Sequence, residues 1–490
     1  MDIYLIGVIV YLLILGGIGV YSSRSVKTQD DFMVAGRKTS ALFLAGTLVC
    51  TWVGSGSLFG GAGLAFRSGI SQLWMSAGAW VGIAIVYFLA HRVRRISQYT
   101  LSDILEQRYN ATARLFGTTA IIIAYLTIAG YQFRGGGRLL NILTGIDPLL
   151  GGAITCAVVI GFTVLAGLVS IISIDLMNGI IMTLGVLIAL PLAYFSIGTD
   201  HLVTLPADRF AVFGQENAVW AMGVFFPTFF LLMGESGMYQ KFFSAKDEST
   251  ARRAVVGMIV GVIIIETSLC LLAVVGSAKY LTLSPFLLQD GSLDKATTET
   301  IILHLARFDI PPVAGVLLIC AAVAIILSTA NTFLMIPSTN ISRDIYQRFI
   351  RPDVSDRAII RFQRFWIVGL GILAFVLANF FKSILDMAFT AYTMVGAGIT
   401  PALLAAFLWK RVTVPGGVSS IVAGMGVTVI ITTLNFILPE PLMETDYIIL
   451  PAAGTSIVAL IAVSLLTAPS PEEKWKPFVS NMQMNRQEQS

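Results

Sequence analysis

The chain has few charged residues and few of the residues that build soluble catalytic sites. Asp, Glu, Lys and Arg make up 12% of its 490 residues, whereas soluble globular proteins carry roughly 25%. Its four cysteines and three histidines are too scattered to form a thiol or imidazole metal cluster. It contains no HExxH or GxSxG motif, and it has no repeated selectivity-filter sequence. These absences argue against a membrane-embedded enzyme and against a channel.

Apolar residues dominate instead, at 56% of the chain. Runs of roughly 20 apolar residues, long enough to cross ~30 Å of hydrocarbon, recur from end to end. We therefore predict an all-α, polytopic membrane protein with about thirteen transmembrane helices. The predicted spans are 3–21, 41–66, 73–91, 116–137, 149–169, 172–196, 218–240, 253–277, 312–340, 363–381, 384–409, 415–437 and 446–467.

The basic residues fall in every second loop between these spans. Loops that carry excess Lys and Arg stay in the cytoplasm, so we expect the amino terminus outside and the carboxyl terminus inside a plasma or inner membrane. The net charge of +4 then reflects membrane topology, and no nucleic-acid partner is expected. Residues 1–467 form one predicted transporter domain, and residues 468–490 form a short polar cytoplasmic tail. The basic loops are 24–38, 92–114, 241–253, 343–364, 410–411 and 474–486.

One predicted span carries an unusual glycine-rich segment, TWVGSGSLFGGAG, at residues 51–63. Two interpretations are open. Gly56 and Gly60 form a GxxxG pair that lets another helix approach closely. Alternatively, the backbone unwinds near residues 53–57 and turns its polar groups toward a solute, which hydrocarbon permits only where the break lines a cavity. Both interpretations can hold together.

A second candidate break lies in FFLLMGESGMYQK, residues 229–241. Gly234 and Gly237 flank Glu235, an acid that hydrocarbon would reject. The two breaks lie five spans apart, as expected for an inverted repeat of five plus five helices whose discontinuous helices meet at the bilayer midplane. The repeat would cover residues 41–409. Three roles stay open for Glu235: pairing with a cationic substrate, proton coupling, or a protonated state held by backbone donors.

The ninth predicted span contains STANTFLMIPSTNISRDIY, residues 328–346. Ser328 and Thr332 lie one turn apart on a helix, with Thr329 beside them. Each hydroxyl can bond back to a carbonyl of its own helix. Together with carbonyls freed at a break, the same hydroxyls suit a hard cation such as sodium, which prefers oxygen ligands.

These segments, together with DDFMVAGRKTS at residues 30–40 and GGGRLLNILTGIDP at residues 135–148, resemble the sodium/solute symporter family. Members of that family carry proline, pantothenate, choline, sugars and sialic acid. The resemblance covers nearly the whole chain and implies the leucine-transporter type of five-plus-five fold. It also implies sodium-coupled import of a small polar organic solute by alternating access, with sodium as coupling ion and no organic cofactor. Proton coupling is the alternative.

The resemblance also implies where sodium binds. The family's main sodium site falls on the carbonyls of Cys50, Val53 and Ile325 and on the hydroxyls of Ser328 and Thr329. Some relatives have a second sodium site. It maps here to Asp175, Asn331 and Thr332, where the asparagine replaces an expected hydroxyl.

Two local resemblances give different expectations of the substrate's charge. TWVG resembles the choline carriers, in which tryptophans enclose a quaternary ammonium through cation–π contacts, whereas YQFRGGGRLL resembles the pantothenate carriers, whose substrate is a carboxylate. A second cage tryptophan is missing from ESGMYQ, where only Tyr239 could replace it. The substrate therefore stays unnamed. Its predicted contacts are Trp52, Gly54, Ser55, Ser57, Ser76, Gln132, Glu235, Tyr239 and Tyr392.

Overall fold

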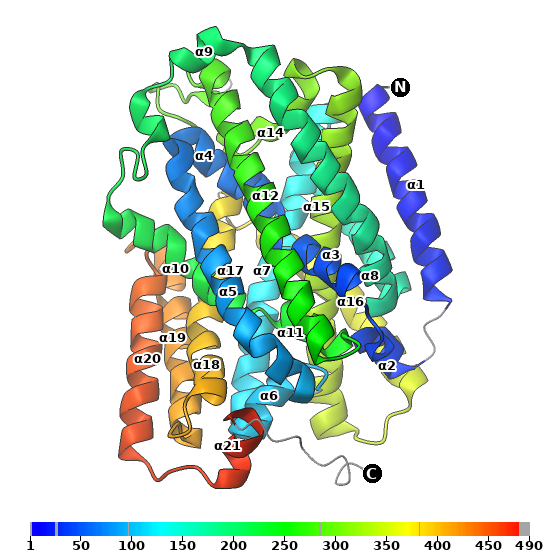
Figure 1. Ribbon diagram of the computed structural model, residues 1–490, viewed down its shortest axis with the longest axis vertical. Coiled ribbons are helices and arrows are strands. Elements are labelled where there is room, and N and C mark those ends of the chain that lie inside the picture. The colour runs from blue at the N-terminus through cyan, green and yellow to red at the C-terminus, as the bar shows by residue number, and fades with distance from the viewer. Residues whose placement is uncertain (1, 25–27, 97, 284–285, 382, 480–490) are drawn as a thin grey trace.

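The computed structural model describes residues 2–24, 28–96, 98–283, 286–381 and 383–479. Residues 25–27 of the first basic loop and residues 480–490 of the predicted tail lie outside the described residues. The described chain is a bundle of helices (Figure 1), and 12 of its helical segments are long and apolar enough to cross a membrane. This confirms the all-α, polytopic prediction.

The long helices alternate with short ones at the two ends of the bundle. The short helices are α2 (Gln29–Val34), α6 (Leu101–Arg108), α9 (Thr199–Val203), α13 (Lys295–Thr298), α14 (Ile301–His304) and α21 (Glu472–Val479). The other α-helices are α1 (Ile3–Ser23), α3 (Ala41–Trp52), α4 (Ala62–Ser68), α5 (Leu73–Ile96), α7 (Ala111–Thr144), α8 (Pro148–Ile197), α10 (Ala218–Gly234), α11 (Ser236–Ser244), α12 (Glu248–Tyr280), α15 (Pro312–Thr339), α16 (Asp356–Ala378), α17 (Ile384–Gly398), α18 (Thr400–Leu408), α19 (Val414–Ile437) and α20 (Ile449–Leu466). The π-helical segments η2 (Gly56–Gly61) and η7 (Asn340–Ile350) lead into α4 and follow α15, respectively.

The predicted span 41–66 is not one continuous helix, which explains why there are twelve long segments instead of thirteen. Helix α3 ends at Trp52, and Val53 adopts extended dihedral angles of φ −75° and ψ 99°. A new helical stretch begins at Gly56 and ends at Ser68. After Gly69, whose φ is 72°, a short 3-10 turn leads into α5, which ends at Ile96, and residues 56–96 together count as one of the twelve segments. The predicted spans 149–169 and 172–196 are the two halves of α8, which is divided at Gly167 by a left-handed φ of 65°.

The second predicted break is also present. Helix α10 ends at Gly234, Glu235 is extended with φ −71° and ψ 106°, and α11 begins at Ser236. Each break leaves the amides or carbonyls on its two sides without partners from the same helix. Both interruptions expected from the glycine-rich segments are therefore confirmed.

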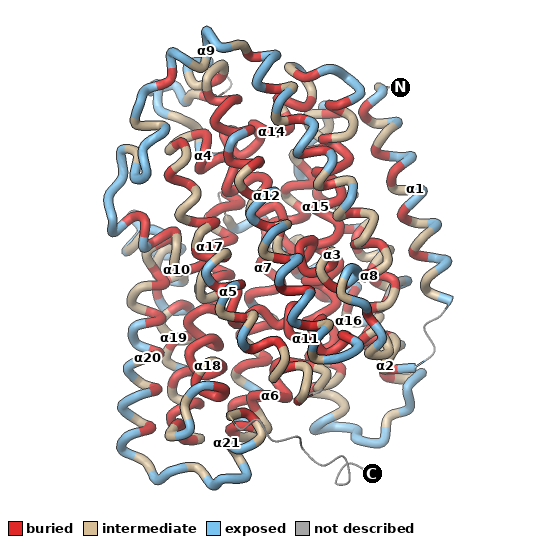
Figure 2. Tube along the Cα trace, viewed as in Figure 1, coloured by how far each residue is buried: buried red, intermediate tan, exposed pale blue. Residues whose placement is uncertain are grey.

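Helices α7, α15 and α17 form the centre of the bundle. Helix α15 packs against α7, α8 and α3, and α17 packs against α7 and α10. Figure 2 shows these central helices as largely buried, whereas α1 and α20 present exposed faces at the outside. The outward side chains of α1 and α20 are mostly apolar, as expected for lipid-facing surfaces. Helices α2, α6 and α21 lie at the same end of the bundle as the carboxyl terminus (Figure 1).

Candidate functional site

The first break and the middle of α15 together bring five oxygen atoms into a small cluster. The Ser328 hydroxyl donates to the Cys50 carbonyl at 3.1 Å and to the Ile325 carbonyl at 3.2 Å. The Thr329 hydroxyl lies 3.1 Å from the Cys50 carbonyl and 3.2 Å from the Val53 carbonyl. All five residues are buried. The structure therefore brings together every residue predicted for the main sodium site.

The spacing of these oxygens is close to that of neighbouring oxygen ligands around a bound cation. A cation with oxygen ligands at roughly 2.4 Å has neighbouring ligands about 3.4 Å apart in an octahedral shell, close to the separations found here. Each hydroxyl can rotate its proton away and present a lone pair to an ion. All five ligands are neutral, so the cluster suits a weakly held single charge better than a divalent metal.

Just beyond these oxygens, the break faces Gln132 on α7. The Gln132 Oε1 atom accepts a hydrogen bond of 2.9 Å from the amide of Ser55. Gln132 Nε2 and the Ser55 hydroxyl are both buried, and neither has a hydrogen-bond partner among the described residues. A Cβ atom at Gly54 would lie 2.8 Å from Gln132 Nε2 and 2.9 Å from Thr329 Cγ2. The backbone at Gly54 therefore packs closely against both Thr329 of the oxygen cluster and the side chain of Gln132, which has an unused donor.

Aromatic rings flank the other side of the break. Trp52 stacks on Tyr392 of α17 with ring centroids 6.4 Å apart. The Tyr392 hydroxyl lies 3.5 Å from that of Tyr131, and a Cβ atom at Gly56 would lie only 2.4 Å from it. A glycine is therefore required at position 56 for this approach.

A buried acid, Glu266 of α12, completes the group. Its carboxylate accepts hydrogen bonds from the indoles of Trp52 and Trp80 at 2.9 and 3.1 Å. It accepts further hydrogen bonds from Ser57, at 3.1 Å, and from Ser76. Among the described residues no basic side chain forms an ion pair with Glu266. The site therefore contains a carboxylate with several neutral donors and no protein cation.

Sequence reasoning found seven of these residues but not the role of Glu266 or Trp80. The predicted Trp52, Gly54, Ser55, Ser57, Ser76, Gln132 and Tyr392 all gather around the first break. Glu266 is an acid within the apolar span 253–277, and an acidic residue inside a predicted transmembrane span indicates a functional position. Its donors come from α3, α5 and the residues after the break, so its partners could not be read from its own helix.

The structure places the other two predicted substrate contacts at the second break. Glu235 accepts hydrogen bonds from the amide of Gly237 at 2.8 Å and from the hydroxyl of Tyr125 at 2.6 Å, and it also accepts from the amide of Met238. The Tyr239 hydroxyl donates to the Met233 carbonyl at 2.7 Å. Both side chains bond across the interrupted helix, and Glu235 caps the start of α11.

The predicted second sodium residues are only partly brought together. Asn331 accepts a hydrogen bond of 3.0 Å from Thr163 on α8. Asp175 accepts from the Thr47 hydroxyl and forms an ion pair of 3.4 Å with Lys241. The Lys241 ammonium also lies 3.4 Å from the Thr332 hydroxyl. Sequence reasoning assigned Lys241 to a cytoplasmic loop; that was wrong, because the side chain is 1% exposed and lies within α11.

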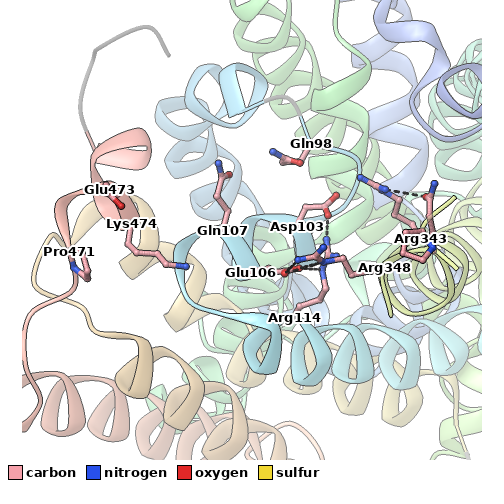
Figure 3. Close-up of a pocket in the computed structure, with 12 residues that line it drawn as sticks. Gln98, Asp103, Glu106, Gln107, Arg114, Arg343, Arg348, Pro471, Glu473 and Lys474 are labelled. Atoms are coloured by element: carbon pink, nitrogen blue, oxygen red, sulfur yellow. Dashed lines mark hydrogen bonds and ion pairs between the residues drawn. The ribbon is translucent and has the colours of Figure 1, made fainter. Parts of the chain in front are cut away.

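A separate cavity of about 710 Å³ opens at the end of the bundle that holds the carboxyl terminus. Figure 3 shows charged side chains of α6, α7, η7 and α21 along its wall. Arg114 of α7 forms ion pairs with Asp103, with Glu106 at 2.9 Å and with Asp344 at 3.6 Å. Arg348 pairs with Glu106 at 2.6 Å (Figure 3). This ionic cluster joins α6, α7 and η7 at that end.

Comparison with known proteins gives consistent matches over most of the chain. A family model described as the sodium:solute symporter family matches residues 32–424. The high-affinity proline transporter PutP of Bacillus subtilis is 25% identical over 479 residues, which cover 92% of this chain and 96% of that protein. The osmoregulated proline transporter OpuE of the same organism is 23% identical over 494 residues, which cover 96% of each chain.

Solved structures confirm the expected fold. A Na+-coupled sialic acid symporter, in a substrate-bound outward-open state, aligns with a TM-score of 0.79 at 17% identity. That alignment covers 96% of this chain and 99% of the symporter. Mhp1, a nucleobase-cation-symport-1 family transporter in a closed conformation, aligns with a TM-score of 0.56 at 10% identity over 91% of this chain and 97% of that one. The fold is therefore that of the five-plus-five inverted-repeat transporters.

Proposed function

Because this chain belongs to the sodium:solute symporter family, we propose that it binds one sodium ion and one small zwitterionic solute at the first break and imports both by alternating access. Family membership makes the protein a sodium-coupled symporter of a small organic solute in a membrane. The positions of the ion and the solute, the solute class and the direction of transport are the proposal.

Sodium binds at the cluster formed by the Cys50, Val53 and Ile325 carbonyls and the Ser328 and Thr329 hydroxyls. The single observation that carries the proposal is the position of Gly54. A Cβ atom added there would lie 3.0 Å or less from both Thr329 and Gln132, so the backbone of the break packs closely against both side chains. An ion held between the two helices fixes the backbone of the break, and the same backbone presents Gly54 and Ser55 to the solute. Sodium therefore favours the conformation in which the solute site is formed, as coupling requires.

Two features of the site support a zwitterionic solute. Glu266 offers negative charge that no basic side chain of the described residues pairs with, and Trp52 and Tyr392 offer ring faces next to it, which favours a solute ammonium. At the break, Gln132 Nε2 and the Ser55 hydroxyl are unused donors suited to a carboxylate. A zwitterion satisfies both groups and accounts for the two opposite substrate resemblances. Proline is the first candidate, because relatives at 23–25% identity are proline transporters.

Uptake by the purified protein in proteoliposomes tests this proposal. We expect saturable proline uptake that requires an inward sodium gradient, with competition from other zwitterionic amino acids but not from choline or pantothenate. Sodium-independent uptake driven by a proton gradient would contradict it and favour the alternative of proton coupling. Uptake of choline or pantothenate in place of amino acids would contradict the solute assignment while leaving sodium coupling intact.

The proposed direction of transport needs the proposed orientation, with the amino terminus outside and the carboxyl terminus in the cytoplasm. The predicted basic segments around α2, α6 and α21 lie at one end of the bundle (Figure 1), which supports this orientation through the positive-inside rule. Reporter fusions after residue 479 should be active only if the reporter functions in the cytoplasm. A reporter that is active only outside would contradict the orientation.

A further inference from the structure

The ammonium of Lys241 occupies an oxygen-lined position deep inside the bundle. It donates to the Thr47 carbonyl at 3.0 Å and to the Thr51 hydroxyl, and it lies 3.4 Å from Asp175 Oδ2. The Thr332 hydroxyl is a fourth oxygen at 3.4 Å. The side chains of Lys241 and Asp175 are each 1% exposed. A primary ammonium has three protons to donate, and here several acceptors converge on it from three other helices.

This oxygen cage repeats the main sodium cluster one helical turn away. Both are built mainly from α3 and α15: Thr47 and Thr51 lie beside Cys50 and Val53, and Thr332 follows Ser328 by one turn, about 6 Å along the helix axis. The cage differs in having a carboxylate, Asp175 from α8, and a lysine that reaches in from α11 just after the second break. Two adjacent positions therefore offer oxygen ligands to cations, and one already holds a covalently attached cation.

We propose that the Lys241 ammonium permanently fills the second cation position, so that the protein binds one exchangeable sodium ion per transport cycle. This inference rests on the proposed sodium position at Ser328 and Thr329. A sodium ion at Asp175 would compete with the ammonium for the same oxygens. The predicted ligand Asn331 does not join them, because its carboxamide oxygen accepts from Thr163.

The attached ammonium of Lys241 keeps the buried Asp175 carboxylate paired throughout the transport cycle, whereas a sodium ion would leave it unpaired after each release. A buried carboxylate without a partner is strongly destabilising, because removing one partner of a buried ion pair leaves an uncompensated charge. With Lys241 in place, Asp175 stays neutralised after sodium has left. The ammonium also links α3, which precedes the first break, and α11, which follows the second break, to α8.

Equilibrium binding of radiolabelled sodium to the purified protein in lipid nanodiscs tests the inference. At saturating sodium, we expect one ion per chain in the wild type and still one in Asp175→Asn. Lys241→Ala vacates the cage while keeping Asp175, so it should bind two ions. The matched double variant Lys241→Ala/Asp175→Asn should return to one. Ethylammonium should displace the added ion from Lys241→Ala without affecting the wild type.

Two bound ions in the wild type, with one lost in Asp175→Asn, would overturn the inference, since the second position would then be open to sodium. A folded Lys241→Ala variant that binds only one ion would also overturn it. If Lys241→Ala does not fold, the comparison of wild type with Asp175→Asn decides alone. A wild type that binds no sodium would contradict the proposed sodium site itself, an outcome distinct from either of these.

Discussion

Two hydroxyls on α15 carry the proposed dependence on sodium. The main cluster has only five oxygens, all neutral, so the loss of one of them should lower the affinity for sodium. A hydrogen bond or ligand contact to a charged group contributes about 1.5–3 kcal/mol. We therefore expect Ser328→Ala and Thr329→Ala each to raise the sodium concentration for half-maximal uptake by about tenfold or more.

Ser338→Ala is the matched control for these variants. Its hydroxyl is buried in the same helix but donates to the carbonyl of Met335, away from the cluster. Its sodium dependence should stay within twofold of the wild type. If all three variants gave the same sodium curve in uptake assays, the assignment of the cluster would be wrong.

Glu266 provides a separate prediction for the solute. Replacing it with Gln keeps the size of the side chain but removes the charge that an ammonium would pair with. Loss of one partner from a buried charge pair costs about 2–5 kcal/mol, so the KM for a zwitterionic solute should rise at least tenfold. The sodium affinity measured without solute should stay unchanged, because the hydrogen bonds of Glu266 go to Trp52, Ser57, Trp80 and Ser76 and to none of the five oxygens of the proposed sodium site.

Trp80→Phe is the companion variant, since it removes one indole donor to Glu266 but keeps the carboxylate and an aromatic ring. We expect a smaller rise in KM than for Glu266→Gln. An unchanged KM in Glu266→Gln would show that this acid only positions Trp52 and Trp80. The two variants together separate charge recognition from packing.

The break after α3 lies next to both the proposed sodium site and the proposed solute site. Gly54 is the position in this break where a substitution should have the largest effect on transport. A Cβ atom there would lie 2.8 Å from Gln132 Nε2 and 3.0 Å from Thr329 Oγ1. Gly54→Ala should therefore raise both the KM for solute and the half-maximal sodium concentration. Gly54→Leu should abolish uptake while the protein remains folded in the membrane.

Gly426→Ala in α19 is the control, because among the described residues no atom outside its own helix backbone lies within 4 Å of the added Cβ position. Its uptake should match the wild type. If Gly54→Leu transported normally, the glycines of the break would serve helix packing only. A defect in solute binding alone would break the proposed link between Gly54 and the sodium cluster.

Both interruptions were predictable because glycine, hydroxyl and acidic residues are conspicuous inside apolar runs. The residues proposed for the main sodium site followed from the family resemblance. They lie close together because α3 and α15 pack against each other. The environments of Lys241 and Glu266 were not predictable. Each is a single charged residue whose partners come from other helices. Lys241 also lies at the end of a predicted span, where a lysine is ordinarily assigned to the solvated loop.

The ionic cluster at the end of the bundle that holds the carboxyl terminus provides a prediction for the assembled bundle. Arg114 is the cation shared by Asp103, Glu106 and Asp344, which join α6, α7 and η7. Arg114→Met leaves the fully buried Asp344 without this partner, so it should destabilise the protein by roughly 3–5 kcal/mol. Adding Asp344→Asn should recover part of the loss. Melting midpoints in detergent measure both effects.

Arg348→Ala is the control for this cluster. Arg348 also pairs with Glu106, but its side chain is 55% exposed, and exposed pairs contribute about 0–1 kcal/mol. Its melting midpoint should shift little. A shift as large as that of Arg114→Met would mean that the destabilisation reflects lost contacts at the cavity wall in general.

The energetics of the complete cycle depend on how many charges cross with each solute. If Lys241 keeps the second position filled, a zwitterion moves with a single positive charge. A membrane potential of 100 mV then contributes ~2.3 kcal/mol, which corresponds to about 50-fold accumulation, and a tenfold sodium gradient adds a further factor of about ten. A carrier that moves two sodium ions per solute would square both the accumulation that is due to the potential and the accumulation that is due to the sodium gradient.

Equilibrium gradients in proteoliposomes distinguish these two cases. With the potential clamped at zero, a tenfold inward sodium gradient should be balanced by an opposing tenfold solute gradient, at which net flux stops. A balance at a hundredfold solute gradient would indicate two sodium ions and would contradict a fixed cation at Lys241. An Asp175→Asn variant that transports should also reach zero net flux at a tenfold solute gradient. The cation paired with Asp175 is the attached ammonium of Lys241, so this substitution removes no sodium ion from the cycle. The gradient at zero flux depends on stoichiometry alone, so a slow or poorly reconstituted variant still reports the same ratio.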